Sequence, residues 1–392
     1  MSEGRASQLE ALPLVAHVVY RFDYGGLENG IVNLINATQG NSIRHCVIAL
    51  TEATEAFRNR LNVRGVGVYE LGKKPGKDFA VYFRFYRLMR RLRPAVLHTR
   101  NVGTLDCAVV GRLSGVSKCI HGEHGWDIHD IDGTNPKYHR MRRVANPFIS
   151  RFVTVSANLK TWLTQSVGIS SRKVTRICNG VDTNRFFPKR NENRHQELIK
   201  KFPEDAVIFG SVLRFQEIKD PMNLVQAFID ASPIAEKSGT KLCLAMIGDG
   251  QLHEAAVNAL NEAGLADRSW LPGSRDDIPE IMRSFDVFVL GSRREGISNT
   301  VLEAMASGLP VIATNTGGNA ELVRPKETGE LVPPEDSAAL AEAVLRFASD
   351  PDLRKGCSVA SRKTAVEEYS LEMMIDRYQR MYCDEIDGRG NG

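Results

Sequence analysis

The order of the apolar runs is the sequence feature that most restricts the possible fold. Strand-like runs alternate with helical stretches, and the whole series then starts again. The first half has strand-like runs at residues 14–20, 45–50, 95–98, 119–123 and 152–155, with helical spacing of apolar residues at 27–37 and 79–92. Strands that alternate with helices predict a parallel sheet covered by helices on both faces.

The second half repeats this pattern after a polar run at 186–193. Strand-like runs at 207–213, 242–247, 287–290 and 311–313 are separated by helical stretches at 223–231, 252–263, 278–284 and 300–306. A chain of 392 residues is too long for one compact core and suits two domains of roughly 150–200 residues. We therefore predict an α/β fold of two Rossmann-like doubly wound domains, at 1–189 and 190–370, followed by a helix and tail at 371–392.

Composition excludes several other classes of protein. No apolar run approaches the roughly 20 residues that cross a bilayer, and the first residues lack the basic and apolar regions of a signal peptide. The seven cysteines form no Cys-x-x-Cys pair, which is typical of reduced thiols rather than of disulfides or a zinc site. We expect a cytoplasmic protein.

Charge is divided unevenly along the chain. Residues 1–190 carry 29 Lys and Arg against 14 Asp and Glu, whereas residues 191–392 carry 22 against 33. A basic half and an acidic half indicate that the two domains bind different ligands.

The segment 292–310 is the most informative for function. It follows a strand, so its loop lies at the strand's carboxyl end, where open α/β sheets bind their ligands. Ser298 or Asn299 can cap a helix that begins near Thr300. The amides of that first helical turn form an anion site suited to a diphosphate.

Two glutamates flank this helix start. Glu295 lies on the loop facing an incoming sugar, and Glu303 lies about one turn into the helix, within reach of ribose hydroxyls. Their spacing, within EGISNTVLEAMASGLPVIATNTGGNAELV, resembles the Glu-x7-Glu motif of retaining glycosyltransferases with the GT-B fold, particularly glycosyltransferase family four. The resemblance implies that the residues between the glutamates also contact the donor: Gly296, Ile297, Ser298, Asn299 and Thr300.

Further motifs of the same family follow along the chain. Gly25 and Gly26 match its N-terminal glycine pair, where backbone approaches the donor phosphate and the acceptor, and His124 matches its active-site histidine near the sugar. The run NGVD at 179–182, followed by Phe186 and Pro188, resembles the segment that ends the first domain.

The second domain carries the cations that the resemblance assigns to the donor diphosphate. They are Arg214 and Lys219, in GSVLRFQEIK, and the turn GDG at 248–250 also matches the family. Cleavage of a sugar–diphosphate bond leaves negative charge, which paired cations and a helix N-terminus stabilise without a metal. We therefore expect neither a metal ion nor a cofactor.

The segment HGEHGWDIHD can also be interpreted as a metal site. His121, His124 and His129 lie three and five residues apart, which is compatible with a metal site on a glycine-rich loop. We favour contact between His124 and the donor.

A basic, aromatic-rich helix is expected at 79–93. Arg84, Arg87 and Arg91 fall on one helical face with Arg90 beside them, and a second basic cluster follows at 139–143. One interpretation is a solvated arginine face on a packed helix, and the other is peripheral docking on an anionic membrane. No nucleic-acid-reading module accompanies these residues, so we expect no nucleic-acid partner.

The resemblance implies a retaining, metal-independent glycosyltransferase. It would move a hexosyl or N-acetylhexosaminyl unit from a nucleotide sugar, UDP-linked rather than GDP-linked, to a glycan or lipid-linked acceptor in bacterial cell-surface polysaccharide synthesis. Alternatives are a GT-B nucleotide-sugar epimerase and an inactive nucleotide-sugar-binding subunit. An NAD-dependent dehydrogenase is disfavoured, because no Gly-x-Gly-x-x-Gly follows the first strand.

Overall fold

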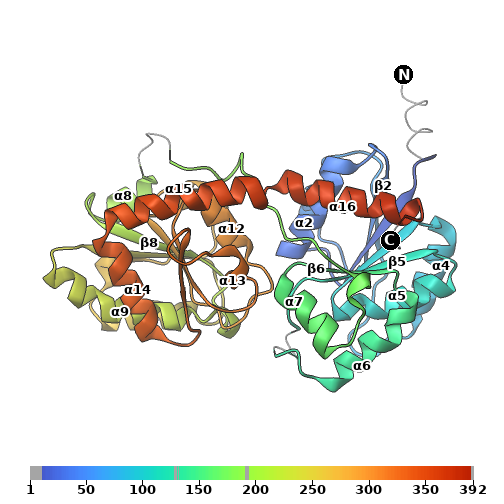
Figure 1. Ribbon diagram of the computed structural model, residues 1–392, viewed down its shortest axis with the longest axis horizontal. Coiled ribbons are helices and arrows are strands. Elements are labelled where there is room, and N and C mark those ends of the chain that lie inside the picture. The colour runs from blue at the N-terminus through green and yellow to red at the C-terminus, as the bar shows by residue number, and fades with distance from the viewer. Residues whose placement is uncertain (1–10, 128–129, 131, 190–193, 390–392) are drawn as a thin grey trace. The chain divides into compact units, whose positions relative to one another are not determined.

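The structure, a computed structural model, describes residues 11–127, 130, 132–189 and 194–389 (Figure 1). Internal contacts divide the chain into two compact units, the first formed by 1–179 with 372–392 and the second by 180–371. Residues 180–189, which the sequence analysis placed at the end of the first domain, pack with the second unit.

The first unit is built on a seven-stranded parallel sheet with the order β3-β2-β1-β4-β5-β6-β7. Its strands are β1 (Leu14–Val19), β2 (Arg44–Ala49), β3 (Gly67–Glu70), β4 (Val96–Arg100), β5 (Lys118–Glu123), β6 (Arg151–Thr154) and β7 (Val174–Arg176). Its helices are α2 (Gly26–Thr38), α3 (Glu55–Arg58), α4 (Ala80–Leu92), α5 (Leu105–Leu113), α6 (Pro136–Ala145), α7 (Ala157–Thr161) and α16 (Leu371–Ile386).

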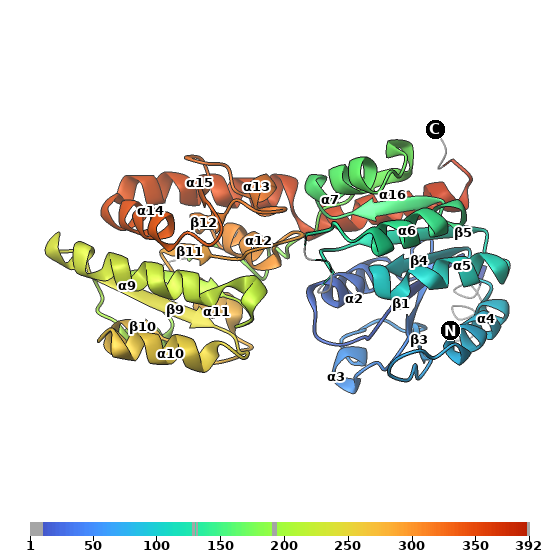
Figure 2. The ribbon, with the colours of Figure 1, turned by 90° about the horizontal axis from the view of Figure 1, so that it is seen from below.

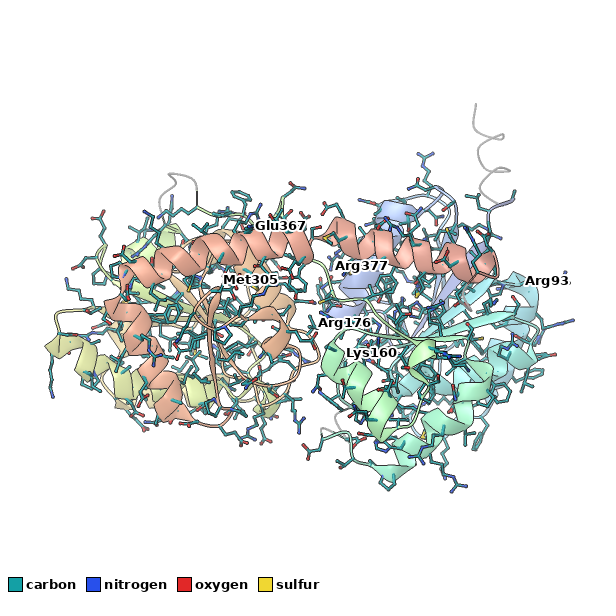
Figure 3. The ribbon with its side chains drawn as sticks, in the orientation of Figure 1. Arg93, Lys160, Arg176, Met305, Glu367 and Arg377 are labelled. Carbon is teal, nitrogen blue, oxygen red and sulfur yellow. The ribbon has the colours of Figure 1, made fainter. Side chains whose placement is uncertain are left out.

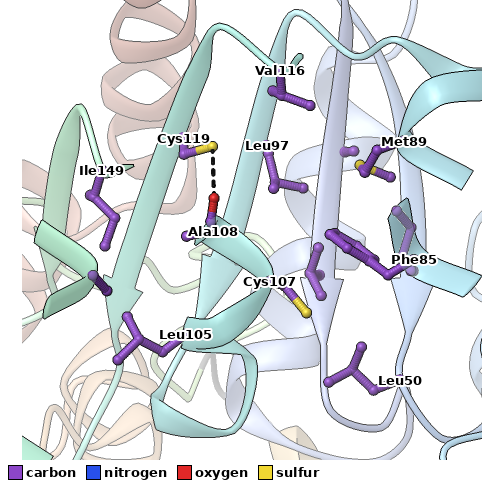
Figure 4. Packing of buried hydrophobic residues seen from close by; sticks show 14 of the residues in the cluster. Leu50, Phe85, Met89, Leu97, Leu105, Cys107, Ala108, Val116, Cys119 and Ile149 are labelled. Atoms are coloured by element: carbon purple, nitrogen blue, oxygen red, sulfur yellow. Dashed lines mark hydrogen bonds between the residues drawn. The ribbon is translucent and has the colours of Figure 1, made fainter. Parts of the chain in front are cut away.

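Two sets of helices cover the two faces of this sheet (Figure 2). Along β2, Val47 and Ala49 pack with apolar residues of α2 and α3, whereas Cys46 and Ile48 belong to a larger cluster with residues of α4 and α5. This division follows from the two-residue period of a strand. In the larger cluster the Cys119 thiol donates to the carbonyl of Ala108, 3.6 Å away (Figure 4).

Helix α16 is joined to the first unit by polar contacts along its length. Tyr382 Oη lies 2.7 Å from His98 Nδ1 on β4, Arg151 Nε donates to Glu385 at 2.8 Å, and the Gln379 amide donates to Ser42 at 3.2 Å. The last helix in the sequence thereby contacts three strands or loops of the first unit.

The second unit is a six-stranded parallel sheet with the order β10-β9-β8-β11-β12-β13. Its strands are β8 (Val207–Val212), β9 (Leu242–Ile247), β10 (Ser269–Trp270), β11 (Val287–Leu290), β12 (Val311–Thr314) and β13 (Gly329–Val332). Its helices are α8 (Gln196–Lys201), α9 (Pro221–Lys237), α10 (His253–Glu262), α11 (Ile278–Met282), α12 (Asn299–Ala306), α13 (Asn319–Leu322), α14 (Ser337–Ser349) and α15 (Pro351–Glu368).

These two sheets confirm the predicted α/β fold, and each has a point at which its strand order reverses. The reversal falls between β1 and β4 in the first unit and between β8 and β11 in the second. Loops that follow these strands diverge to opposite faces and leave a crevice for ligands. Within the described part of the chain, no helix is long and apolar enough to cross a membrane.

Candidate functional site

The loop after β11 leads directly into α12, as the sequence predicted. Ser298 is the N-cap, and its hydroxyl accepts from the amide of Val301 at 3.3 Å, so Ser298 rather than Asn299 caps the helix. α12 packs against α15, and its Met305 lies inside the second unit (Figure 3). Asn299 and Thr300 form the first turn, with amides in the position that binds anions.

Glu295 is a buried carboxylate held by two side chains. Its Oε1 accepts from Lys219 Nζ at 2.6 Å and from the Ser292 hydroxyl at 2.7 Å, and the residue is 6% exposed. A carboxylate buried to this extent loses its hydration, and the paired ammonium and the hydroxyl compensate for that loss. The structure therefore brings together two residues that the sequence selected from segments 76 positions apart.

Two glycines after β12 shape the loop that carries Glu295. Gly317 has φ of +50°, and a Cβ placed there would lie 1.8 Å from the carbonyl oxygen of Glu295. At Gly318 it would lie 2.3 Å from the carbonyl oxygen of Gly296 and 2.5 Å from Ile297. Only glycine permits this approach of two backbones, so the turn fixes the positions of Glu295, Gly296 and Ile297.

Arg214 lies on the loop after β8, and this loop is also held by glycines that approach its backbone closely. A Cβ at Gly248 would lie 1.8 Å from the Leu213 carbonyl oxygen, and one at Gly250 would lie 2.5 Å from that of Phe215. Arg214 itself is exposed, and its guanidinium forms no hydrogen bond or ion pair with another described residue. A free cation on the segment after β8 that also carries Lys219 is suited to binding a phosphate.

Glu303 differs from Glu295 in its environment. Burial raises its pKa from the ordinary 4.5 to about 7, opposed by the nearby Arg185. Its carboxylate forms no hydrogen bond with the rest of the described chain. An acceptor or donor group without a partner is available to a hydroxyl of a ligand.

The Gly25–Gly26 pair lies at the start of α2, after β1. Gly25 is the N-cap of the helix, with extended backbone that any residue adopts, and a Cβ there would meet only the flexible carboxylate of Glu28. Gly26 lines a small cavity together with Arg100 and His124. Backbone strain therefore does not require a glycine at position 25, and the space beside the pair is the small cavity that Gly26 lines.

His124 follows β5, and a hydrogen bond from its backbone amide holds it in place. Its amide donates to the Asn101 side chain at 2.8 Å, while Nε2 is buried without a hydrogen-bond partner among the described residues. Burial, followed by the positive charge of Arg100, lowers the pKa of His124 to about 3. The imidazole is therefore neutral at physiological pH and can donate or accept a hydrogen bond.

The described histidines of the HGEHGWDIHD segment, His121 and His124, are not part of a metal-binding group of described residues. His121 Nδ1 lies 2.8 Å from the Thr99 hydroxyl, and its other nitrogen lies 3.4 Å from Glu123, whose carboxylate is bound by Arg142. His129 lies outside the described residues. Across the described segments, no group of three or more His, Cys, Asp or Glu side chains is arranged to hold a metal.

The sequence contains an Asp-x-Asp triplet at 130–132, a pattern that can hold a divalent ion in other proteins. Asp130 accepts from the amides of Thr134 and Asn135, both at 2.9 Å, so this carboxylate oxygen terminates a turn ahead of α6. The triplet belongs to the first unit, whereas the cations assigned to the diphosphate belong to the second.

The structure revises the basic face expected at 79–93. Arg84 is engaged, because it donates to the Leu71 carbonyl and to Asp78, both at 2.8 Å. Apart from Ala80, the exposed residues of the segment are instead aromatic or basic: Phe79, Phe83, Tyr86, Arg87, Arg90, Arg91 and Arg93. In the second cluster Arg142 is buried against Glu123 and is not available to a partner.

Sequence reasoning missed Ser292 and Arg100. Ser292 is 2.7 Å from Glu295, and Arg100 ends β4 beside the reversal of strand order. The position of Arg100 at the carboxyl end of a strand was the available signal, but the strand was expected to end at residue 98.

Two parallel sheets, each with a reversal of strand order, define the class of this protein, an α/β protein of GT-B architecture. Family models match most of the chain: residues 24–185 match "Glycosyltransferase Family 4" and residues 206–350 match "Glycosyl transferases group 1". The chain belongs to glycosyltransferase family four and is a glycosyltransferase. The resemblance inferred from the motifs is thus confirmed.

Individual relatives agree with this assignment. The chain is 27% identical to the UDP-Gal:alpha-D-GlcNAc-diphosphoundecaprenol alpha-1,3-galactosyltransferase of Escherichia coli, over 79% of this chain and 80% of the relative. It is 24% identical to the N-acetyl-alpha-D-glucosaminyl L-malate synthase of Bacillus anthracis, over 83% and 84%.

Solved structures share the fold. A glycosyltransferase from Rickettsia africae has a TM-score of 0.81 at 21% identity, covering 96% of this chain and 99% of that one. HepE from Anabaena, crystallised with UDP and glucose, has a TM-score of 0.78 at 18% identity, covering 94% and 99%.

The raised pKa of Glu303 predicts a dependence of stability on pH. Between its ordinary pKa of 4.5 and about 7, the folded chain holds a proton that the unfolded chain has released. The stabilising contribution is therefore complete below about 4.5 and is lost as the pH rises to about 7. Relative to Glu303→Gln, the wild-type unfolding midpoint should fall as the pH is raised from 5 to about 8.

Thermal unfolding followed by circular dichroism measures this difference. Glu254→Gln, at an exposed glutamate of α10, is the matched control and should follow the wild type at every pH. A constant difference between wild type and Glu303→Gln over the whole range would contradict the shifted pKa.

Proposed function

We propose that this chain is a retaining glycosyltransferase that moves a hexosyl or N-acetylhexosaminyl unit from a UDP-linked sugar to a glycan or lipid-linked acceptor. The observation that carries the proposal is the Lys219–Glu295 ion pair, which joins the segment that carries Arg214 to the loop that leads into the capped N-terminus of α12. Cations and helix amides suit a diphosphate, and carboxylates suit sugar and ribose hydroxyls. We expect the same pocket to include Gly296, Ile297, Ser298, Asn299 and Thr300.

Each charged group has a proposed role. Arg214 and Lys219 bind the diphosphate and stabilise the charge that develops as the sugar leaves. Glu303 binds the ribose hydroxyls, and Glu295 orients hydroxyls of the donor sugar. We propose that His124, neutral because of its lowered pKa, contacts the sugar, and that the backbone at Gly25 and Gly26 approaches the donor phosphate and the acceptor.

A positioning role for Glu295 fits its contacts better than a nucleophilic one. Oε1 already accepts from Lys219 and Ser292, and the strong hydrogen bond from Lys219 reduces the reactivity of the carboxylate. We propose that the acceptor attacks from the leaving-group face and that the departing phosphate oxygen takes its proton. The anomeric configuration is then retained without a covalent intermediate.

The relatives support the choice of substrate class. The named E. coli relative uses UDP-Gal and a lipid diphosphate acceptor, and another relative, from Staphylococcus aureus, is named as a capsular polysaccharide biosynthesis glycosyltransferase. We therefore propose a place in bacterial cell-surface polysaccharide synthesis, with the protein on the cytoplasmic face of the membrane that holds the lipid carrier.

Membrane attachment is proposed to use the exposed face of α4. Phe79, Phe83 and Tyr86 supply aromatic side chains, and Arg87 and Arg90 supply positive charge beside them. Aromatic rings suit the interface region of a bilayer, and arginines are attracted to anionic headgroups.

The basic test is acceptor-dependent transfer. A thermal-shift panel of nucleotide sugars identifies the donor, because a ligand that binds only the folded chain raises its unfolding midpoint. Release of UDP that requires an acceptor would support transfer. Conversion of the donor to an epimer without an acceptor would instead support the epimerase alternative.

Glu295→Gln should keep substantial turnover. We expect donor KM to rise by roughly tenfold or more, because a hydrogen bond to a charged group contributes about 1.5–3 kcal/mol. Lys219→Met should weaken donor binding similarly, and Glu254→Gln should change neither KM nor kcat. Loss of turnover by a factor of about 10⁴ or more, with donor binding intact, would indicate a carboxylate nucleophile.

Removal of divalent metals should leave transfer unchanged. Arg214, Lys219 and the α12 amides are proposed to supply the charge stabilisation that a metal gives in other enzymes. Initial rates before and after dialysis against EDTA measure this. A loss of activity that added Mg²⁺ or Mn²⁺ restores would contradict metal independence.

The α4 face should bind anionic vesicles at physiological salt. Wild-type protein should float with phosphatidylglycerol-containing liposomes and not with phosphatidylcholine alone, and Arg87→Glu with Arg90→Glu should abolish flotation. The control is Arg172→Glu with Lys237→Glu, which makes the same change in net charge at exposed residues elsewhere. Equal flotation of both double variants would exclude α4 as the docking face.

A further inference from the structure

Arg100 is a buried cation whose charge acts on the Glu28 carboxylate but forms no ion pair with it. It ends β4, is 4% exposed, and forms no ion pair with any carboxylate of the described chain. One of its terminal nitrogens lies 3.0 Å from His17 Nδ1 and 3.2 Å from His98 Nδ1, and the other donates to the His98 carbonyl. Its Nε has no hydrogen-bond partner.

The histidines around Arg100 do not neutralise it. His17, His45 and His98 lie on the same face of the sheet, and burial with the charge of Arg100 lowers the pKa of each. His45 Nε2 in turn lies 2.8 Å from the Thr38 hydroxyl, and His17 Nε2 lies 2.9 Å from His45 Nδ1. This chain of neutral rings fixes the guanidinium but supplies no negative charge.

Arg100 also lines the small cavity beneath the start of α2. The cavity has a volume of about 20 Å³, and its other lining residues include Gly26, Gly30, His124, Asn179 and Tyr378. A space of this size holds little more than one water molecule. It therefore admits an oxygen atom of a ligand group, while the remainder of the ligand stays at its mouth.

Two residues that line this space, Arg100 and His124, each carry a buried nitrogen without a hydrogen-bond partner among the described residues. These atoms are Arg100 Nε and His124 Nε2, and the residues lining the cavity include no carboxylate. A buried charge without a counterion is costly, so such groups are usually paired or await a partner. A planar guanidinium matches the oxygens of a phosphate or a carboxylate.

We propose that Arg100 is the centre of an anion subsite in the first unit, which takes an oxygen of a phosphate or carboxylate group carried by a substrate of the transfer reaction. His124 supplies a second donor to the same oxygen through Nε2. The reaction to which that substrate belongs rests on the proposed function, whereas the subsite itself rests on the charge and the cavity. The anionic group belongs either to the acceptor or to the donor diphosphate.

Binding of inorganic phosphate to the full-length chain tests this subsite directly. Calorimetric titrations at constant ionic strength, with UDP saturating the donor site, exclude phosphate binding at Arg214 and Lys219. We expect wild type to bind phosphate and Arg100→Gln to bind it at least about tenfold more weakly, since a hydrogen bond to a charged group contributes roughly 1.5–3 kcal/mol. Arg172→Gln, at an exposed arginine, should remain within about twofold of wild type.

A parallel titration with UDP alone distinguishes the two sources of the anion. Unchanged UDP affinity in Arg100→Gln, with weakened phosphate binding, assigns the subsite to the acceptor. Tenfold weaker UDP binding, with no phosphate binding to the UDP-saturated wild type, assigns it to the donor diphosphate. The proposal is overturned if Arg100→Gln matches wild type in both titrations, or if wild type shows neither phosphate binding nor an Arg100-dependent UDP affinity.

Arg100→Lys covers the case in which the glutamine variant does not fold. It keeps the positive charge but loses the planar fork, so we expect anion binding several-fold weaker than in wild type. Wild-type affinity in this variant together with the glutamine variant's failure to fold would leave Arg100 a structural residue and refute the subsite. Because phosphate binding needs no turnover, a chain that binds phosphate but transfers no sugar would refute the proposed function and not the subsite.

Discussion

The contact between Lys219 and Glu295 joins the two loops on which the proposed donor site depends. One loop follows β8 and the other follows β11, and these neighbouring strands lie where the sheet order reverses. Each loop is separately fixed by glycines that let another backbone approach, at Gly248 and Gly250 for the first and at Gly317 and Gly318 for the second. The ion pair therefore lies between two rigid supports, which is the condition for holding a catalytic group in a defined position.

The two units handle buried charge in different ways. In the second unit the buried carboxylate Glu295 has its cation in place, and Glu303 avoids a buried charge through a raised pKa. In the first unit Glu123 is paired with Arg142, whereas Arg100 contacts neutral rings, and its charge acts on the Glu28 carboxylate without forming an ion pair. A completed pair needs nothing more, but an incomplete one favours a ligand that carries the missing charge. This difference is the basis for assigning a binding role to Arg100.

The sequence predicted the architecture correctly but did not predict the edge strands of the two sheets. The strands that it predicted were long apolar runs such as β1 and β9, which are buried along their whole length. The strands that it missed lie mostly at sheet edges, including β3, β7, β10 and β13, and β10 has only two residues. Edge strands are short and half exposed, so they carry little hydrophobic pattern. Helices α14 and α15 were also missed, although α14 has a clear apolar face.

By itself the sequence determined the fold class, the family and the residues between Glu295 and Glu303, because these depend on local pattern and on motifs with fixed spacing. It also selected Arg214 and Lys219 as the cations of the second domain. Only the tertiary structure decided that Lys219 pairs with Glu295, that Ser292 shares that carboxylate, that Arg84 is engaged with Asp78, and that Arg100 is buried without an ion pair to a described carboxylate. Each of these facts depends on side chains from distant segments meeting in a low-dielectric interior, and chain spacing carries no record of such encounters.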